Sequence, residues 1–173
     1  MVVDLGLRLA FTFLMASICI EDLRQMIIRD RSVLWVIALF VPFAALHGYP
    51  FERIVYHLVT GLVFFAVLFI AAVWAPLGPL GGGDAKIMGA LGIWFGVGSS
   101  ASIDFLVLAC LIGGAFTLAA YAFRFFAGVL PVQTRVPLPW LENLLFGPTP
   151  VMRVSVPFGV PLAIAGGVTV WSL

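Results

Sequence analysis

The stretch PLGPLGGGDAK, residues Pro76–Lys86, separates two apolar segments of membrane length. Three consecutive glycines precede Asp84, and glycine permits positive φ angles and the close approach of other groups. A carboxylate at the mouth of a hydrophobic segment is costly unless it has a task. From this stretch alone two interpretations are open: Asp84 caps the helix that follows, or it belongs to a functional site.

The composition is that of a membrane protein. Of the 173 residues, 63% are hydrophobic and 10% are charged, and the mean hydropathy is +1.18. Soluble domains have about 45–50% apolar and about 25% charged residues. The formal net charge of +1 leaves no basic patch to neutralise phosphates, so a nucleic-acid partner is excluded. The chain is therefore predicted to be an all-α, polytopic protein whose first partner is the lipid bilayer.

Six apolar segments are predicted to cross the bilayer, judged against the roughly 20 apolar residues that span about 30 Å of hydrocarbon. They are approximately Leu5–Ile20, Val33–Leu46, Ile54–Trp74, Ala85–Gly98, Ile103–Phe123 and Val156–Leu173. The fourth contains Gly89, Gly92, Gly96 and Gly98, which favours close packing of other helices on it. The first is read as a retained span, because no basic region leads it and no small-residue cleavage site follows it.

The two cysteines, Cys19 and Cys110, both fall within these apolar segments. Their positions predict neither a disulfide framework nor a C-x-x-C metal site. We therefore expect no bound metal or cofactor, and the sequence does not indicate an oligomeric state.

The distribution of basic residues predicts the orientation. If the spans alternate, Arg8 and Arg53 lie on one side and the other lysine and arginine residues lie on the opposite side. The positive-inside rule makes the second side cytoplasmic. On that side, Asp22 follows the first span and Asp84 precedes the fourth.

Two carboxylates at the same membrane face are able to converge in a bundle. In a partly dry site they cannot both ionise easily, so one acts as a base on water while the other, protonated, polarises a carbonyl. That is the chemistry of an aspartic protease. The competing interpretation makes Asp22 and Asp84 interfacial caps, or ion-pair partners of Arg24 and Lys86.

The long connection at residues 124–155 is rich in proline and is predicted to be a cytoplasmic loop of a single membrane domain, residues 1–173. Within it, a proline at the start of Pro139–Phe146 and Gly147 at its end indicate a short helix. Its apolar residues share one face, so this helix is expected to lie in the membrane interface. A plain proline-rich linker is the alternative.

Three motifs resemble those of the type IV prepilin peptidases, which are membrane aspartic peptidases of the GxGD type. They are Gly81-Gly82-Gly83-Asp84-Ala85-Lys86, similar to the G-x-G-D segment; Asp22-Leu23-Arg24, similar to the segment of the first catalytic aspartate; and Val156-Pro157-Phe158-Gly159, similar to the motif of the last span. They occur in the family's order and with suitable hydrophobic spacing.

The resemblance implies a GxGD peptidase-like bundle in the bacterial inner membrane. Such an enzyme removes the basic leader from prepilin or pseudopilin precursors at the cytoplasmic face, without a cofactor. Asp22 and Asp84 would be the catalytic pair, and the glycines Gly81, Gly82 and Gly83 would give their loop freedom. Lys86 would pair with Asp84 or with an acidic residue of the substrate. Pro157 and Phe158 would shape the floor of the site, or would only start a helix.

The chain also departs from the family pattern. Where relatives carry Ile-Pro-Asn after the first aspartate, this chain has Ile28-Arg29-Asp30, which makes Asp30 a rival of Asp22. The flanking Arg29 and Arg31 favour a solvated, self-paired run instead.

The segment Glu21–Arg31 holds no cysteine pairs, so the methyltransferase domain of the larger members is expected to be missing. The short form resembles the peptidases of tight-adherence (Flp-type) pilus systems. Archaeal preflagellin peptidases, a non-catalytic membrane assembly factor and a small transporter are the alternatives.

Overall fold

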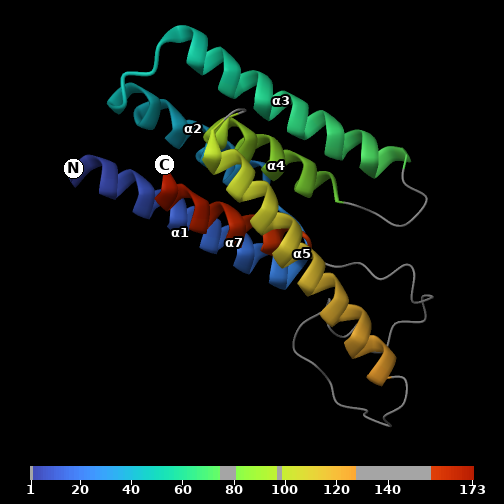
Figure 1. Cartoon of the computed structure of the whole chain (residues 1–173). Coiled ribbons are helices and arrows are strands. Elements are labelled where there is room, and N and C mark those ends of the chain that lie inside the picture. The colour runs from blue at the N-terminus through green and yellow to red at the C-terminus, as the bar shows by residue number, and fades with distance from the viewer. Residues whose placement is uncertain (1, 75–80, 97–98, 128–156) are drawn as a thin grey trace.

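A computed structural model describes residues 2–74, 81–96, 99–127 and 157–173. Within these residues the fold is all-α, as predicted (Figure 1). The helices are α1 (Val2–Gln25), α2 (Asp30–Leu46), α3 (Phe51–Trp74), α4 (Gly82–Phe95), α5 (Ser100–Ala127) and α7 (Gly159–Thr169), followed by the 3-10 turn η2 (Val170–Ser172). Each of the six apolar segments of the sequence therefore contains one helix.

Three helices are long and apolar enough to cross a membrane: α1, α3 and α5, the last over Ser100–Ala122. Their outward surfaces are apolar. On α3, for example, the exposed side chains include Leu62, Val67 and Ile70. Helices that expose such surfaces along their length are stable in lipid and not in water. The chain is thus an integral membrane protein.

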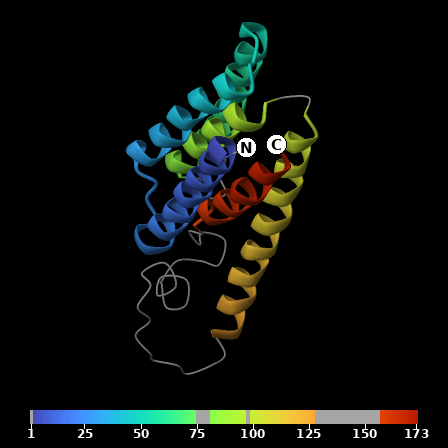
Figure 2. The same ribbon diagram turned by 90° about the vertical axis from the view of Figure 1, so that its left-hand side faces the viewer.

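The shorter helices α4 and α7 occupy the interior of the bundle, between the long ones (Figure 2). Most of α7 is buried, and α4 is buried along the face from Asp84 to Phe95. Because protein covers them on most sides, neither has to match the thickness of the bilayer by itself. Their first turns meet at the end of α1, at one end of the bundle.

Glycines allow α3 and α4 to pack in close contact. A Cβ atom on Gly89 would lie 2.9 Å from the Cβ of Phe65, and one on Gly92 would lie 3.0 Å from the Cα of Gly61. Small residues at a helix interface permit this approach of two backbones in a membrane. The predicted packing role is confirmed at Gly89 and Gly92. It also holds at Gly96, which ends α4 with φ of 62° and where a Cβ atom would lie 2.8 Å from Cε1 of His57 on α3. Gly98 lies outside the described residues.

An aromatic core around Trp94 fixes the other side of α4. The Trp94 ring lies 4.3 Å from that of Phe11 on α1 and 5.0 Å from that of Phe43 on α2, measured between centroids. Its indole N–H donates to the carbonyl oxygen of Val36 at 2.7 Å, which satisfies the one polar atom of a fully buried side chain. This core joins α1, α2 and α4 and holds α4 in register.

The two termini lie next to each other in both views (Figures 1 and 2). A guanidinium N–H of Arg8 on α1 donates to the carbonyl oxygen of Val170 in η2 at 2.7 Å. The side chain thus joins the start of α1 to the end of the chain.

The predicted loop 124–155 differs from the structure at its start, because α5 continues to Ala127. From residue 128 on, the loop lies outside the described residues. The interfacial helix at Pro139–Phe146 therefore stays a prediction.

Candidate active site

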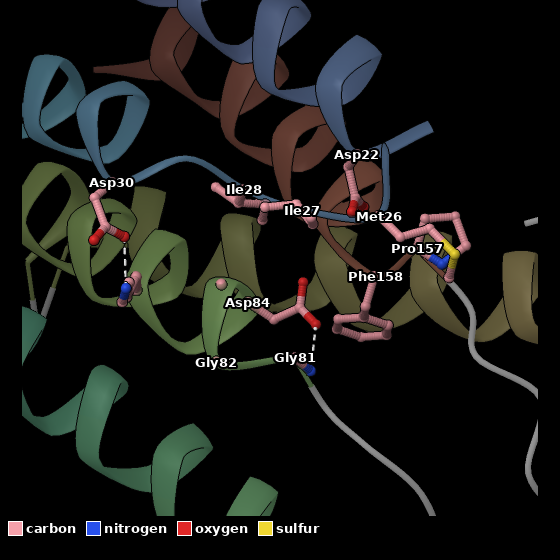
Figure 3. A pocket seen from close by; sticks show the side chains of 12 residues that line it. Asp22, Met26, Ile27, Ile28, Asp30, Gly81, Gly82, Asp84, Pro157 and Phe158 are labelled. Carbon is pink, nitrogen blue, oxygen red and sulfur yellow. Dashed lines mark hydrogen bonds and ion pairs between the residues drawn. The ribbon is translucent and has the colours of Figure 1, made fainter. Parts of the chain in front are cut away.

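A cavity of about 470 Å³ lies where the end of α1 meets the first turns of α4 and α7 (Figure 3). It is lined by Asp22, Met26, Ile27, Ile28, Asp30, Gly81, Gly82, Gly83, Asp84, Lys86, Pro157 and Phe158. All eight residues predicted for the site are in this set, although they come from three distant segments of the sequence. Figure 3 shows the carboxyl groups of Asp22 and Asp84 on opposite walls of the cavity, with Phe158 beside them.

Asp22 lies in the last turn of α1 and is only 4% exposed. Its Oδ2 atom accepts a hydrogen bond of 3.2 Å from the backbone N–H of Val160, in the first turn of α7. A carboxylate at the start of a helix is stabilised by the free N–H groups and the helix dipole. This contact joins two segments that are distant in sequence. Within the described part of the chain, no side-chain cation forms an ion pair with the Asp22 carboxylate.

Asp84 is the third residue of α4 and is 8% exposed. Its Oδ2 atom accepts a hydrogen bond of 3.1 Å from the N–H of Gly81, the residue before the helix. A bond from the N–H before the helix to the side chain of the third helical residue is one of the two hydrogen bonds of a capping box. The capping interpretation is thus correct as a description of local geometry, but the same carboxyl group also faces the cavity and Asp22.

Burial and, to a smaller extent, the nearby Asp22 carboxylate together raise the pKa of Asp84 to about 6, against the opposing effect of the hydrogen bond from Gly81. Desolvation and a like charge both disfavour the ionised form of a carboxyl group. A group with such a pKa is able to give and take a proton near neutral pH. None of the ion pairs formed within the described part of the chain involves Asp22 or Asp84.

The glycines before Asp84 differ from the expectation of a free loop. Gly82 and Gly83 already belong to α4, and Gly81 is extended with φ of −67°. At Gly83 the reason for glycine is steric, because a Cβ atom there would lie 3.1 Å from the Cβ of Ile28. The missing side chain lets the connection between α1 and α2 cross directly over the start of α4.

Lys86 pairs with Asp30 at 2.5 Å and not with Asp84. The other partner considered for Lys86, an acidic residue of the substrate, stays a prediction. The Asp30 side chain is 72% exposed. The expected pairing of Asp30 with its flanking arginines also differs from the structure, in which Arg29 lies 3.5 Å from Glu21. An exposed carboxylate that is already paired with a cation lacks the dry environment of a catalytic acid or base, which makes Asp30 a weaker rival of Asp22.

Pro157 and Phe158 form the wall at the start of α7. Pro157 is buried and Phe158 is half-buried. The Phe158 ring fits against the backbone of α5 at Gly113, where a Cβ atom would lie 3.0 Å from it. Both residues precede the helix and line the cavity, so the two roles considered for them occur together.

Sequence reasoning missed the apolar wall made by Met26, Ile27 and Ile28. Met26 has a left-handed backbone with φ of 52°, and its N–H still donates to the carbonyl of Asp22 at 2.9 Å. This conformation turns the chain out of α1 and over the cavity. The available signal was three successive apolar residues in an otherwise charged connection.

The residues that the structure describes contain no group of three or more His, Cys, Asp or Glu side chains that could hold a metal ion. What the cavity offers is a pair of buried carboxyl groups with backbone N–H partners, at one end of a membrane bundle. This arrangement defines a membrane protein of the aspartyl-pair class.

Residues 9–118 match the type IV leader peptidase family, and the match includes both Asp22 and Asp84. The chain belongs to this family, whose members are aspartic peptidases that remove the leader peptides of prepilins. No curated protein and no solved structure was found to match the chain. The matched residues end before Pro157 and Phe158, and they do not include α7.

Proposed function

We propose that this peptidase cleaves the leader from a type IV or Flp-like prepilin, or from a pseudopilin, with Asp22 and Asp84 as its catalytic pair. The observation that carries the proposal is the arrangement of these two buried carboxyl groups on one cavity, with neither of them in an ion pair among the described residues. Two carboxyl groups so placed share a proton, because the second ionisation is opposed by the first charge.

The shared proton supplies the chemistry of amide hydrolysis. The ionised member takes a proton from a water molecule while the protonated member polarises the scissile carbonyl, and the proton taken from water then goes to the leaving amine. The pKa of Asp84, raised to about 6, supports proton exchange by this group near neutral pH. The apolar wall of Met26, Ile27 and Phe158 limits access of other water to the reacting groups.

The cavity is proposed to face the cytoplasm. Arg24, Arg29 and Lys86 lie at its end of the bundle, and the positive-inside rule assigns such an end to the cytoplasmic side. At about 1.5 Å per residue, the rise of α1 from Asp4 to Asp22 is about 27 Å, close to the hydrocarbon thickness of about 30 Å. The pair would therefore sit at the boundary of an inner membrane, within reach of a leader in the cytoplasm.

The short connection between α1 and α2 supports a peptidase of the Flp type. It comprises only the residues between Gln25 and Asp30 and holds no cysteine. A methyltransferase insert is thus not present at this position. Cleavage of the leader without methylation of the new N-terminus is the expected activity.

The test is cleavage of a co-expressed Flp-type prepilin by the full chain and by three variants, Asp22→Asn, Asp84→Asn and Asp30→Asn. We expect the first two to lose processing by about 10²–10⁴-fold, the contribution of a general acid or base, and Asp30→Asn to retain it. If both Asp22→Asn and Asp84→Asn process the precursor normally, the assignment of the pair fails. If Asp30→Asn is the inactive variant, Asp30 replaces Asp22.

A preflagellin and a pseudopilin precursor offered to the same membranes extend the test. Preferential cleavage of the preflagellin would move the protein to the archaeal-type alternative while leaving the pair in place.

A further inference from the structure

The first turn of α7 is built around the Asp22 carboxylate. The N–H of Val160 donates to Oδ2 of Asp22 over a separation of 138 positions in the sequence. Gly159, the residue before it, is buried. A Cβ atom on Gly159 would lie 2.8 Å from Oδ2 and 3.1 Å from Cγ of Asp22, and 2.7 Å from Cδ1 of Ile28. The hydrogen atom of a glycine is the largest group that fits between this helix and the carboxylate.

The two aspartates therefore have different surroundings. Asp22 lies against the start of a helix of 11 residues that carries no charged side chain. Asp84 accepts its hydrogen bond from Gly81, within its own first turn. The other charged groups at the cavity, Asp30 and Lys86, are paired with each other. Hydrogen bonds from N–H groups at a helix start stabilise an ionised carboxylate more than a protonated one.

We propose that Gly159 and Val160 are positioning residues that assign the roles in the pair, with Asp22 held as the ionised base and Asp84 left as the proton donor. This inference rests on the proposed function of the pair and deepens it. It gives a task to the last helix, which lies outside the residues matched by the family.

The assignment gives a balanced reaction. Asp22 takes one proton from water as the water oxygen bonds to the carbonyl carbon, and the Asp84 proton moves to the carbonyl oxygen. The tetrahedral intermediate then collapses: the C–N bond breaks, the proton on Asp22 goes to the leaving nitrogen, and one hydroxyl returns its proton to Asp84. Both side chains end in their starting states.

The decisive variant is Gly159→Ala, assayed for cleavage of a prepilin in membranes. Its methyl group must displace the Asp22 carboxylate or Ile28. A misplacement of about 1 Å costs about 100-fold in rate, so we expect kcat to fall by about that factor while KM changes little. The acidic limb of the pH–rate profile should also move to higher pH, because Asp22 loses the N–H that favours its ionised form.

The double variant Ile28→Val, Gly159→Ala separates the two contacts. Valine lacks Cδ1, so the contact with Ile28 is relieved while the contact with Asp22 remains. The loss of kcat and the shifted limb should persist in the double variant, relative to Ile28→Val alone. If Ile28→Val restores both, the effect is packing and the positioning role is wrong.

Gly166→Ala serves as the matched control on the same helix. Its Cβ would lie 2.8 Å from Cδ2 of Leu91, an equally close contact far from the carboxyl groups. It should lower thermal stability without moving the pH–rate profile. If Gly159→Ala behaves like this control while Asp22→Asn is inactive, the positioning role fails and the catalytic pair stands. If Asp22→Asn is active, the pair itself fails.

Discussion

The two ends of α1 hold aspartates in opposite ways. Near its start, Asp4 accepts a hydrogen bond of 3.0 Å from the Arg8 side chain, and its second oxygen lies 3.6 Å from His47. Near its end, Asp22 is almost fully buried and has a backbone N–H as its partner. One carboxylate stabilises the join between helices as part of an ion pair, and the other is kept available.

The presence or absence of an ion-pair partner separates the proposed catalytic carboxylates from Asp4 and Asp30. An ion pair holds a carboxylate in its charged form and removes it from proton transfer at neutral pH. Asp4 and Asp30 have cations beside them, whereas Asp22 and Asp84 face each other across a cavity. A cation placed in direct contact with Asp22 or Asp84 would therefore be expected to inactivate the enzyme without unfolding it.

The largest effect is expected from Phe158→Lys, which places a cation beside the two buried carboxyl groups. Phe158 lies beside the pair, so the introduced ammonium group would lower the pKa of Asp84 and hold both carboxylates charged. We expect leader cleavage to fall by about 10²-fold or more, the contribution of a general acid. The measurement is the initial rate of prepilin cleavage in membranes.

Phe158→Met is the matched control for the lost ring, and it should keep most of the activity. Equal rates for the two variants would mean that the ring, and not the absence of a cation, matters at this position.

Stability should respond in opposite directions to Asp84→Asn and Asp4→Asn. Because folding raises the pKa of Asp84 from 3.8 to about 6, the folded state binds more protons between these values and loses stability as the pH rises through them. The loss approaches about 3 kcal/mol above pH 6, because a tenfold change in proton affinity corresponds to about 1.4 kcal/mol. Asp84→Asn should remove it, whereas Asp4→Asn should cost about 0.5 kcal/mol through the lost pair with Arg8.

The measurement is thermal unfolding of the purified protein in detergent at pH 4.5 and pH 8. The gain from Asp84→Asn should be fully present at pH 8 and smaller by about 2 kcal/mol at pH 4.5, where the folded state still holds the proton. A loss of stability at both pH 4.5 and pH 8 would show that the Asp84 carboxyl group stabilises the fold as a helix cap and that its ionisation does not destabilise the folded state.

Lys86→Met should have the smallest effect on stability. Its ion pair with Asp30 joins two largely exposed side chains, and such pairs contribute about 0–1 kcal/mol. The same unfolding assay at low and high salt should show a difference below about 1 kcal/mol that disappears in high salt. A larger loss that persists in high salt would mean that Lys86 stabilises the helix start by a contact other than this ion pair.

The helices were predictable because hydropathy is a local property of the chain. The segments predicted around Val33–Leu46 and Ile54–Trp74 correspond to α2 and α3 with small changes at the ends. The site residues could be named as a set, because the motif wording and the positive-inside rule place Asp22 and Asp84 at one membrane face. Their partners could not be named: Lys86 pairs with Asp30, whereas Asp84 and an acidic residue of the substrate were the partners considered.

The sequence by itself thus determined an all-α membrane protein, the order of its helices, and two carboxylates on one side. Only the tertiary structure decided that α4 and α7 form the interior, that Asp22 and Asp84 share a cavity, and that Gly159 lies against Asp22. The physical reason is the distance along the chain over which each interaction acts. Burial in lipid acts on each segment separately, whereas a contact between Asp22 and Val160 depends on how all the intervening helices pack.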